Sequence, residues 1–294
     1  MNGPTEPRVS PVLDAPLETA PTAERGAVRR LIRRRPLVSF FVLSCLLSWW
    51  MAALYASGMW SEPIVGCGPF LAALTVLGVT EGRRGVKALL RSMVRWRVPG
   101  RAYLLAIGLP LLLTGMAPIV ANLALGAEPS AGTLGAWTTV PLVAMIVLLV
   151  PGLGGAWEEP GFRGYALTRL EAKFGAMTGP LVLGLLHVVW HGPLFLTGQI
   201  LWTDALVVVA SSVVIAFVFH TGRESVLVAM IFHAFNNAVG GQYASQIFHG
   251  ADQTQLGILT ALAWWLVAAA VLVAMRRRSR PKGGGFANEV PVTP

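Results

Sequence analysis

Two glutamates and an arginine form the first of three polar clusters in this strongly apolar chain of 294 residues. The carboxylates of Glu158 and Glu159 are adjacent, and Arg163 follows Glu159 by four positions. This spacing places Glu159 and Arg163 on one helical face, where they can form an ion pair, and directs Glu158 elsewhere. Glu158 is then available for proton transfer. The alternative interpretation of the cluster is an interfacial helix cap with a salt bridge on the helix surface.

The second cluster carries two imidazoles, His187 and His191, which share a helical face because they are four positions apart. Such a pair can bind one metal ion, but Val188 stands where a zincin carries its catalytic glutamate. A standard zincin is therefore not expected. A pair of hydrogen-bonded core histidines stays the alternative. His191 directly precedes the Gly192-Pro193 break, which makes it the better candidate for an accessible imidazole.

The third cluster places His233 and Asn237 on one helical face, again four positions apart. Neutral imidazole and amide groups are good donors to a developing oxyanion, although polar side chains also join membrane helices structurally. An ionisable group at the centre of a bilayer costs roughly 2.5–3.5 kcal/mol, so function is the first hypothesis where one occurs. A carboxylate, imidazoles and an amide together predict hydrolysis by a carboxylate-activated water.

Apolar stretches of membrane-spanning length must position these clusters. Hydrophobic residues make up 54% of the chain and charged residues only 13%, about half the share that soluble domains carry. We predict an all-α, polytopic membrane helix bundle of about eight transmembrane helices. The expected spans are residues 37–58, 63–80, 103–125, 136–156, 178–197, 204–221, 225–242 and 256–275.

The net charge of +9 is distributed in a way that indicates membrane topology and not nucleic-acid binding. All 23 Lys and Arg residues fall on one side of the predicted membrane if both termini are cytoplasmic. The charged residues expected on the other side are all acidic, namely Glu62, Glu128, Asp204 and Asp252. The positive-inside rule therefore predicts a multi-pass membrane protein, with anionic lipids of the inner leaflet beside its basic segments. We expect the membrane to be a cytoplasmic (plasma) membrane.

Three regions follow from this distribution. Residues 1–35 are expected to form a disordered, basic N-terminal tail, residues 36–275 the membrane-embedded helical domain, and residues 276–294 a flexible cytoplasmic tail. The polar clusters place the catalytic core within residues 150–240. Residues 83–98 predict a helix lying in the inner membrane interface, because basic and apolar side chains occupy its opposite faces.

In this order the three clusters resemble the CPBP family of intramembrane endopeptidases, which includes the CAAX prenyl proteases and bacterial proteins linked to bacteriocin processing or self-immunity. The similar runs are Glu158-Glu159-Pro160-Gly161-Phe162-Arg163-Gly164-Tyr165, Trp190-His191-Gly192-Pro193-Leu194-Phe195, and His233 through Asn237. One departure is His187, since the family usually has an aromatic residue four positions before its motif histidine. His187 is then a passive substitute, a second proton carrier or a metal ligand.

The resemblance implies a role for each matched residue. Glu158 would be the general base that activates the hydrolytic water, and His191 would help to hold and polarise that water. His233 and Asn237 would stabilise the tetrahedral oxyanion. The ion pair of the first cluster would brace the site.

The resemblance also bears on cofactors and partners, because the family has been described both as metalloproteases and as metal-independent glutamate proteases. We expect no cofactor to be required; a zinc ion, if bound, would be held by Glu158, His191 and His233. The implied substrate is a peptide or protein cleaved near a prenylated or transmembrane segment, from a cavity open to the cytoplasm. The alternatives are a non-enzymatic immunity or scaffold protein and a proton-coupled transporter on the same helices.

Overall fold

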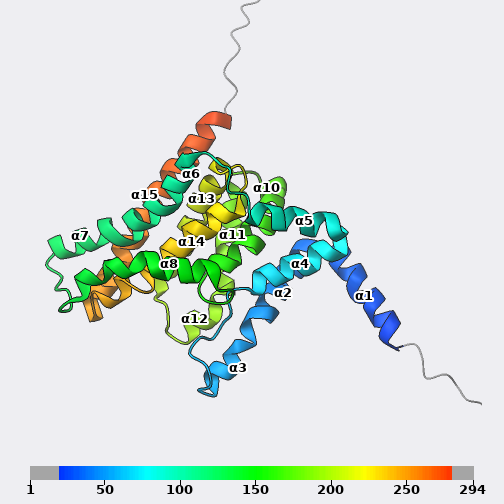
Figure 1. Cartoon of the computed structure of the whole chain (residues 1–294), viewed down its shortest axis with the longest axis horizontal. Coiled ribbons are helices and arrows are strands. Elements are labelled where there is room, and N and C mark those ends of the chain that lie inside the picture. Colours follow the sequence, from blue (N-terminus) through cyan, green and yellow to red (C-terminus); the bar gives the residue numbers. More distant parts are fainter. Residues whose placement is uncertain (1–19, 280–294) are drawn as a thin grey trace, which may run out of the picture.

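The computed structural model describes residues 20–279, and within that range the chain is a bundle of helices without a strand. The predicted all-α architecture is confirmed. Figure 1 shows α13 (Trp202–Thr221) and α14 (Val226–Gly240) inside the bundle, in contact with helices from distant parts of the sequence. The other helices and helical turns are α1 (Ala20–Arg34), α2 (Pro36–Trp49), α3 (Met51–Ala56), α4 (Gly68–Thr80), α5 (Gly82–Met93), α6 (Gly100–Pro110), η1 (Leu111–Met116), α7 (Ala117–Ala124), η2 (Thr133–Thr139), α8 (Val140–Leu149), η3 (Ala156–Glu158), α9 (Glu159–Gly161), η4 (Phe162–Leu167), α10 (Thr168–Phe174), α11 (Thr178–Trp190), α12 (Gly192–Leu196), η5 (Ala244–Gln246) and α15 (Gly250–Ser279).

Within residues 20–279, four helical segments are long and apolar enough to cross a membrane. They are Pro36–Ala56, Gly100–Ala124, Trp202–Thr221 and Gly250–Arg277. Shorter apolar helices occupy Gly68–Thr80, Gly135–Leu149 and Thr178–Trp190, and α14 fills the remaining predicted span. These helices indicate an integral membrane protein. The count of about eight crossings and the orientation of the termini stay predictions.

Both basic ends of the chain are more helical than the sequence suggested. Residues 20–34 of the expected disordered tail form α1, and α15 continues through the basic residues after 275 as far as Ser279. Arginine is a good helix former, and Ile32 of α1 is buried against the bundle. The rest of both predicted tails lies outside the described residues.

One end of the bundle carries the basic segments, and we call it the basic face. It comprises α1, α5, α10, the turn at residues 222–225 and the end of α15. Ser225 Oγ donates a hydrogen bond to the Arg95 carbonyl oxygen at 2.7 Å, and Arg169 pairs with Glu81. The helix predicted within residues 83–98 is present as α5, with basic side chains exposed and Leu89 buried.

The opposite end, the loop face, consists of the connections at residues 57–67, 125–139, 197–201 and 241–249. Gln199 Nε2 donates to the Ser61 carbonyl oxygen at 2.8 Å, and Ser130 N donates to the Ile247 carbonyl oxygen at 2.7 Å. Long helices separate the two faces. The candidate span in α15 alone has 28 residues, which corresponds to a length of about 42 Å.

Candidate active site

A glycine-rich loop after α8 carries Glu158 into the middle of the bundle. Gly154 has a φ of +64°, a conformation that L side chains rarely adopt. Gly155 has an ordinary φ of −90°, but a Cβ atom added to it would lie 2.1 Å from Nε2 of His233. Glycine is therefore needed at 154 for the backbone and at 155 for the close approach of α14. The loop ends α8 earlier than predicted and lets a new helix start beside the site.

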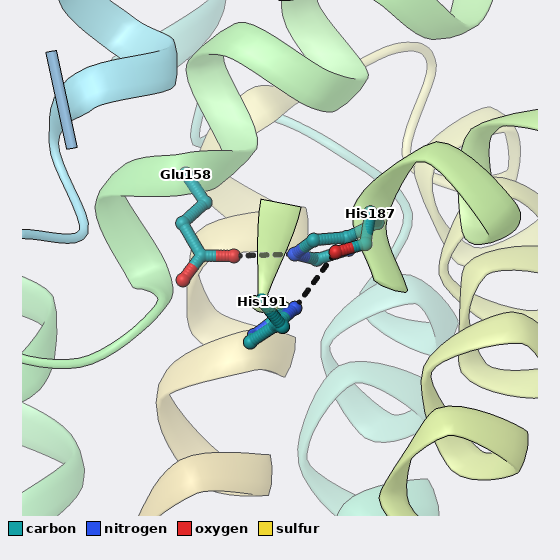
Figure 2. Close-up of side chains that lie close together, drawn as sticks. All are labelled: Glu158, His187 and His191. Carbon is teal, nitrogen blue, oxygen red and sulfur yellow. Dashed lines mark hydrogen bonds and ion pairs between the residues drawn. The ribbon is translucent and has the colours of Figure 1, made fainter. Parts of the chain in front are cut away.

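Glu158 points toward His187, and His191 lies next to this pair (Figure 2). The Oε2 atom of Glu158 is 2.7 Å from Nε2 of His187, and both side chains are buried. Nδ1 of His191 is 2.9 Å from the backbone carbonyl oxygen of His187, so Nδ1 donates and Nε2 is left as an acceptor. One ligand atom from each of the three side chains lies within 4.8 Å of the others. One water molecule can bridge that separation.

Glu159 forms the structural half of the carboxylate pair. Its Oε1 atom accepts a hydrogen bond from Nη1 of Arg163 at 3.0 Å and lies 2.5 Å from Nδ1 of His233. Nη2 of Arg163 reaches Oγ of Ser212 on α13 at 3.4 Å. All four side chains are buried. Because an unpaired charge in such a place is strongly destabilising, each partner is needed to keep the others charged and in position.

A cavity of about 830 Å³ connects these groups. Glu158, His187, His191, His233 and Asn237 all line it, whereas the second carboxylate of the pair lies behind them. Ligand sites usually have volumes of about 300–1,000 Å³, so the space suits a segment of peptide. The cavity is where chemistry can take place.

The structure therefore brings the predicted catalytic residues together from α11, α14 and the turn after α8. Two relationships differ from expectation. The group that could bind a metal contains His187, and not His233, beside Glu158 and His191. His233 is held by Glu159 instead. The ring of His187 also packs against Phe162, with ring centroids 4.3 Å apart, so it fills an aromatic position while donating to a carboxylate.

Sequence reasoning missed the partners that hold this site from a distance. No base lies near Ser212 in the sequence, yet its hydroxyl contacts Arg163 across 49 positions. Thr114 donates to Oδ1 of Asn236 at 2.7 Å and accepts from Nε1 of Trp264 at 3.0 Å, which anchors the cavity wall beside the third cluster. A hydroxyl within an otherwise apolar span was the available signal for Thr114.

The donor chemistry of Glu158, His187 and His191 suits zinc, which binds carboxylate oxygen and imidazole nitrogen. Metal binding requires ligands without a proton on the binding atom. Zinc would therefore displace the proton that the 2.7 Å contact holds between Glu158 and His187. Within residues 20–279 no other group of three such side chains has this geometry.

Residues 136–239 match the family model described as type II CAAX prenyl endopeptidase Rce1-like. The resemblance predicted from the three clusters is confirmed. This CAAX prenyl endopeptidase-like region contains the whole candidate site, from Glu158 to Asn237. The CAAX prenyl protease 2 of Methanococcus maripaludis is 26% identical over 139 residues, which are 43% of this chain. The match covers 49% of that relative, so the chain spans about half the length of the curated protein that it matches.

Proposed function

We propose that this protein is an intramembrane endopeptidase that hydrolyses a peptide bond with a water molecule activated by Glu158. The observation that carries the proposal is the buried Glu158 carboxylate, positioned by His187 and next to His191, in the wall of a peptide-sized cavity. The similarity to CAAX prenyl endopeptidases supports this reaction class.

In the first step, a water molecule lies between the Glu158 carboxylate and the free Nε2 of His191. The water gives one proton to Glu158 while its oxygen bonds to the carbonyl carbon of the substrate peptide. His187 donates to one carboxylate oxygen and so orients the other toward the water. The electron pair of the carbonyl moves to its oxygen and produces a tetrahedral oxyanion.

His233 and Asn237 are the donors for this oxyanion. Because Nδ1 of His233 faces the ion-paired Glu159 carboxylate, Nε2 can donate as well only if the ring is an imidazolium. The proposed donor at His233 is therefore an imidazolium, and not the neutral imidazole that we expected from the sequence. The carboxylates of Glu158 and Glu159 balance the positive charges of Arg163 and this imidazolium. The oxyanion then reforms a carbonyl as the C–N bond breaks, and Glu158 returns its proton to the leaving amine.

Zinc has a defined place if it is bound: Glu158, His187 and His191 would hold it, and it would supply Lewis-acid polarisation of water. We propose that the reaction does not require it, since a carboxylate base, a water acceptor and oxyanion donors are all supplied by side chains. The pattern of contacts described above needs no further group to complete a hydrolytic cycle.

The substrate in this proposal is a peptide or protein with a prenylated or transmembrane segment near the scissile bond. The enzyme would lie in a bacterial cytoplasmic membrane with both termini in the cytoplasm. The basic side chains exposed on α1 and α5 would then contact anionic lipid head groups, each contributing about 1 kcal/mol near the surface.

The purified protein should cleave a member of a panel of lipidated and transmembrane peptides, and Glu158→Gln should lower kcat by about 10²–10⁴-fold. The matched control is Glu128→Gln, which makes the same change at an exposed carboxyl on the loop face. Cleavage that is insensitive to Glu158→Gln would refute the assignment. A binding or immunity protein would cleave nothing, and a transporter would instead show proton-coupled flux in proteoliposomes.

A further inference from the structure

The cavity extends from the reacting groups to the loop face. Glu62 lines it from the connection before α4, Gln199 from the connection before α13, and Ser245 from the connection after α14. The first two of these connections are hydrogen-bonded to each other through the Gln199 side chain and the Ser61 carbonyl oxygen. Three separate loops of one face thus form the cavity wall farthest from the basic segments.

Toward the basic face the cavity is closed. None of the described residues in 67–113, 164–186, 216–232 and 261–279 lines it. The bundle is filled there by large side chains that are at most 2% exposed, namely Phe162, Tyr165, Leu167, Phe219 and Phe232. Arg163, which is paired with Glu159 behind it, forms the polar floor of the cavity.

We infer that the substrate peptide enters from the loop face, which is the extracytoplasmic side if the basic face is cytoplasmic. This reverses the opening that we expected from the sequence. That expectation placed Glu158 at the cytoplasmic end of a span running to residue 156. In the structure α8 stops at Leu149, and the helical stretch from Glu159 to Phe174 covers the basic side of the site. That the cavity admits a substrate peptide rests on the proposed function. The face on which the cavity opens is inferred only from the residues that line it.

The charges along the cavity indicate what kind of peptide fits. Glu62 and Asp204 line it on the side of the loop face. Arg163 is the only Lys or Arg among the described lining residues, and its charge is taken up by Glu159. The substrate class is therefore a neutral or positively charged peptide segment of a membrane-anchored protein, presented at the outer surface.

Cysteine labelling can determine the direction of entry without any cleavage assay. In a background with Cys45→Ala and Cys67→Ala, Ser211→Cys places a thiol in the cavity wall halfway along α13. Ser44→Cys is its matched control, because Ser44 is also a buried mid-helix serine bonded to its own backbone but does not line the cavity. Lys87→Cys marks the basic face.

A membrane-impermeant maleimide should label Ser211→Cys in sealed spheroplasts and Lys87→Cys only in inverted vesicles. Ser44→Cys should stay unlabelled in both preparations. Labelling of Ser211→Cys and Lys87→Cys from the same side would overturn the inference. So would a failure to label Ser211→Cys from either side, or labelling of Ser44→Cys to the same extent.

A second arm separates this inference from the proposed function. The peptide selected in the cleavage panel, made membrane-impermeant, is added to spheroplasts and to inverted vesicles. Cleavage only in spheroplasts supports entry from the loop face, and cleavage only in inverted vesicles overturns it. Cleavage in neither preparation, for a peptide that the purified protein cleaves, also overturns it. If the purified protein cleaves no peptide of the panel while the labelling is as expected, the proposed function fails and the direction of the cavity is still supported.

Discussion

Replacing Gly155 with alanine should disable the site while leaving the fold largely intact. The added Cβ would lie 2.1 Å from Nε2 and 2.4 Å from Cε1 of His233. Atoms pack best at about 3.5–4.0 Å, so the ring must retreat by more than about 1 Å. The ring is held at 2.5 Å by Glu159, and a hydrogen bond to a charged group contributes about 1.5–3 kcal/mol. A misplacement of about 1 Å can lower a rate about 10²-fold.

We therefore expect Gly155→Ala to lower the free energy of unfolding by about 1–3 kcal/mol and kcat/KM by about 100-fold. Unfolding can be followed by tryptophan fluorescence in detergent, and activity by peptide cleavage. Gly78→Ala is the matched control, since a Cβ at Gly78 on α4 would meet nothing within 4 Å. The clash itself is isolated by a double-mutant cycle with His233→Ala, in which Gly155→Ala should become nearly neutral for stability.

Two results would refute this reasoning. If Gly155→Ala behaved like Gly78→Ala in both assays, His233 would not approach the loop as the structure shows. If the loss of stability persisted in the His233→Ala background, the clash would not be its origin. Either outcome would remove the argument that the loop holds the oxyanion donor in place.

Arg163→Ala should lower the free energy of unfolding by about 3–5 kcal/mol, because Glu159 would be left buried without its cation; a loss well below 1 kcal/mol in denaturant titrations would contradict this. His187→Phe restores an aromatic residue but removes the donor to Glu158, so kcat should fall at least about tenfold and the free energy of unfolding by about 1–3 kcal/mol. An unchanged kcat would make His187 a passive substitute. A strong zinc chelator should leave kcat unaltered, and loss of activity that added zinc restores would argue for a metal-dependent reaction.

The local geometry of the site was predictable because the relevant spacing lies within single helices. Glu159 and Arg163 are four positions apart on a helical stretch that starts at Glu159, and they form the expected ion pair. The same spacing brings His187 and His191 to one side of α11. Helical periodicity determines such neighbours without knowledge of the rest of the fold.

Contacts between different helices could not be predicted from the sequence. His187 and His233 have the same residue type and similar surroundings in sequence, yet one pairs with Glu158 and the other with Glu159. The choice depends on the angle at which α11 and α14 approach the turn after α8. The positive φ angles of Gly152 and Gly154 show that the chain turns early enough to bury the Glu158 carboxylate, and the sequence does not specify such angles.

The most direct test of the central claim is a single-turnover cleavage in ¹⁸O-labelled water, with the products and the enzyme analysed by mass spectrometry after rapid quenching. We predict one labelled oxygen in the new carboxyl group, no peptide covalently attached to the enzyme, and no detectable product on the same timescale with Glu158→Gln. A peptide–enzyme adduct formed before product release, or normal incorporation of the label by Glu158→Gln, would contradict direct attack by a water molecule that Glu158 activates.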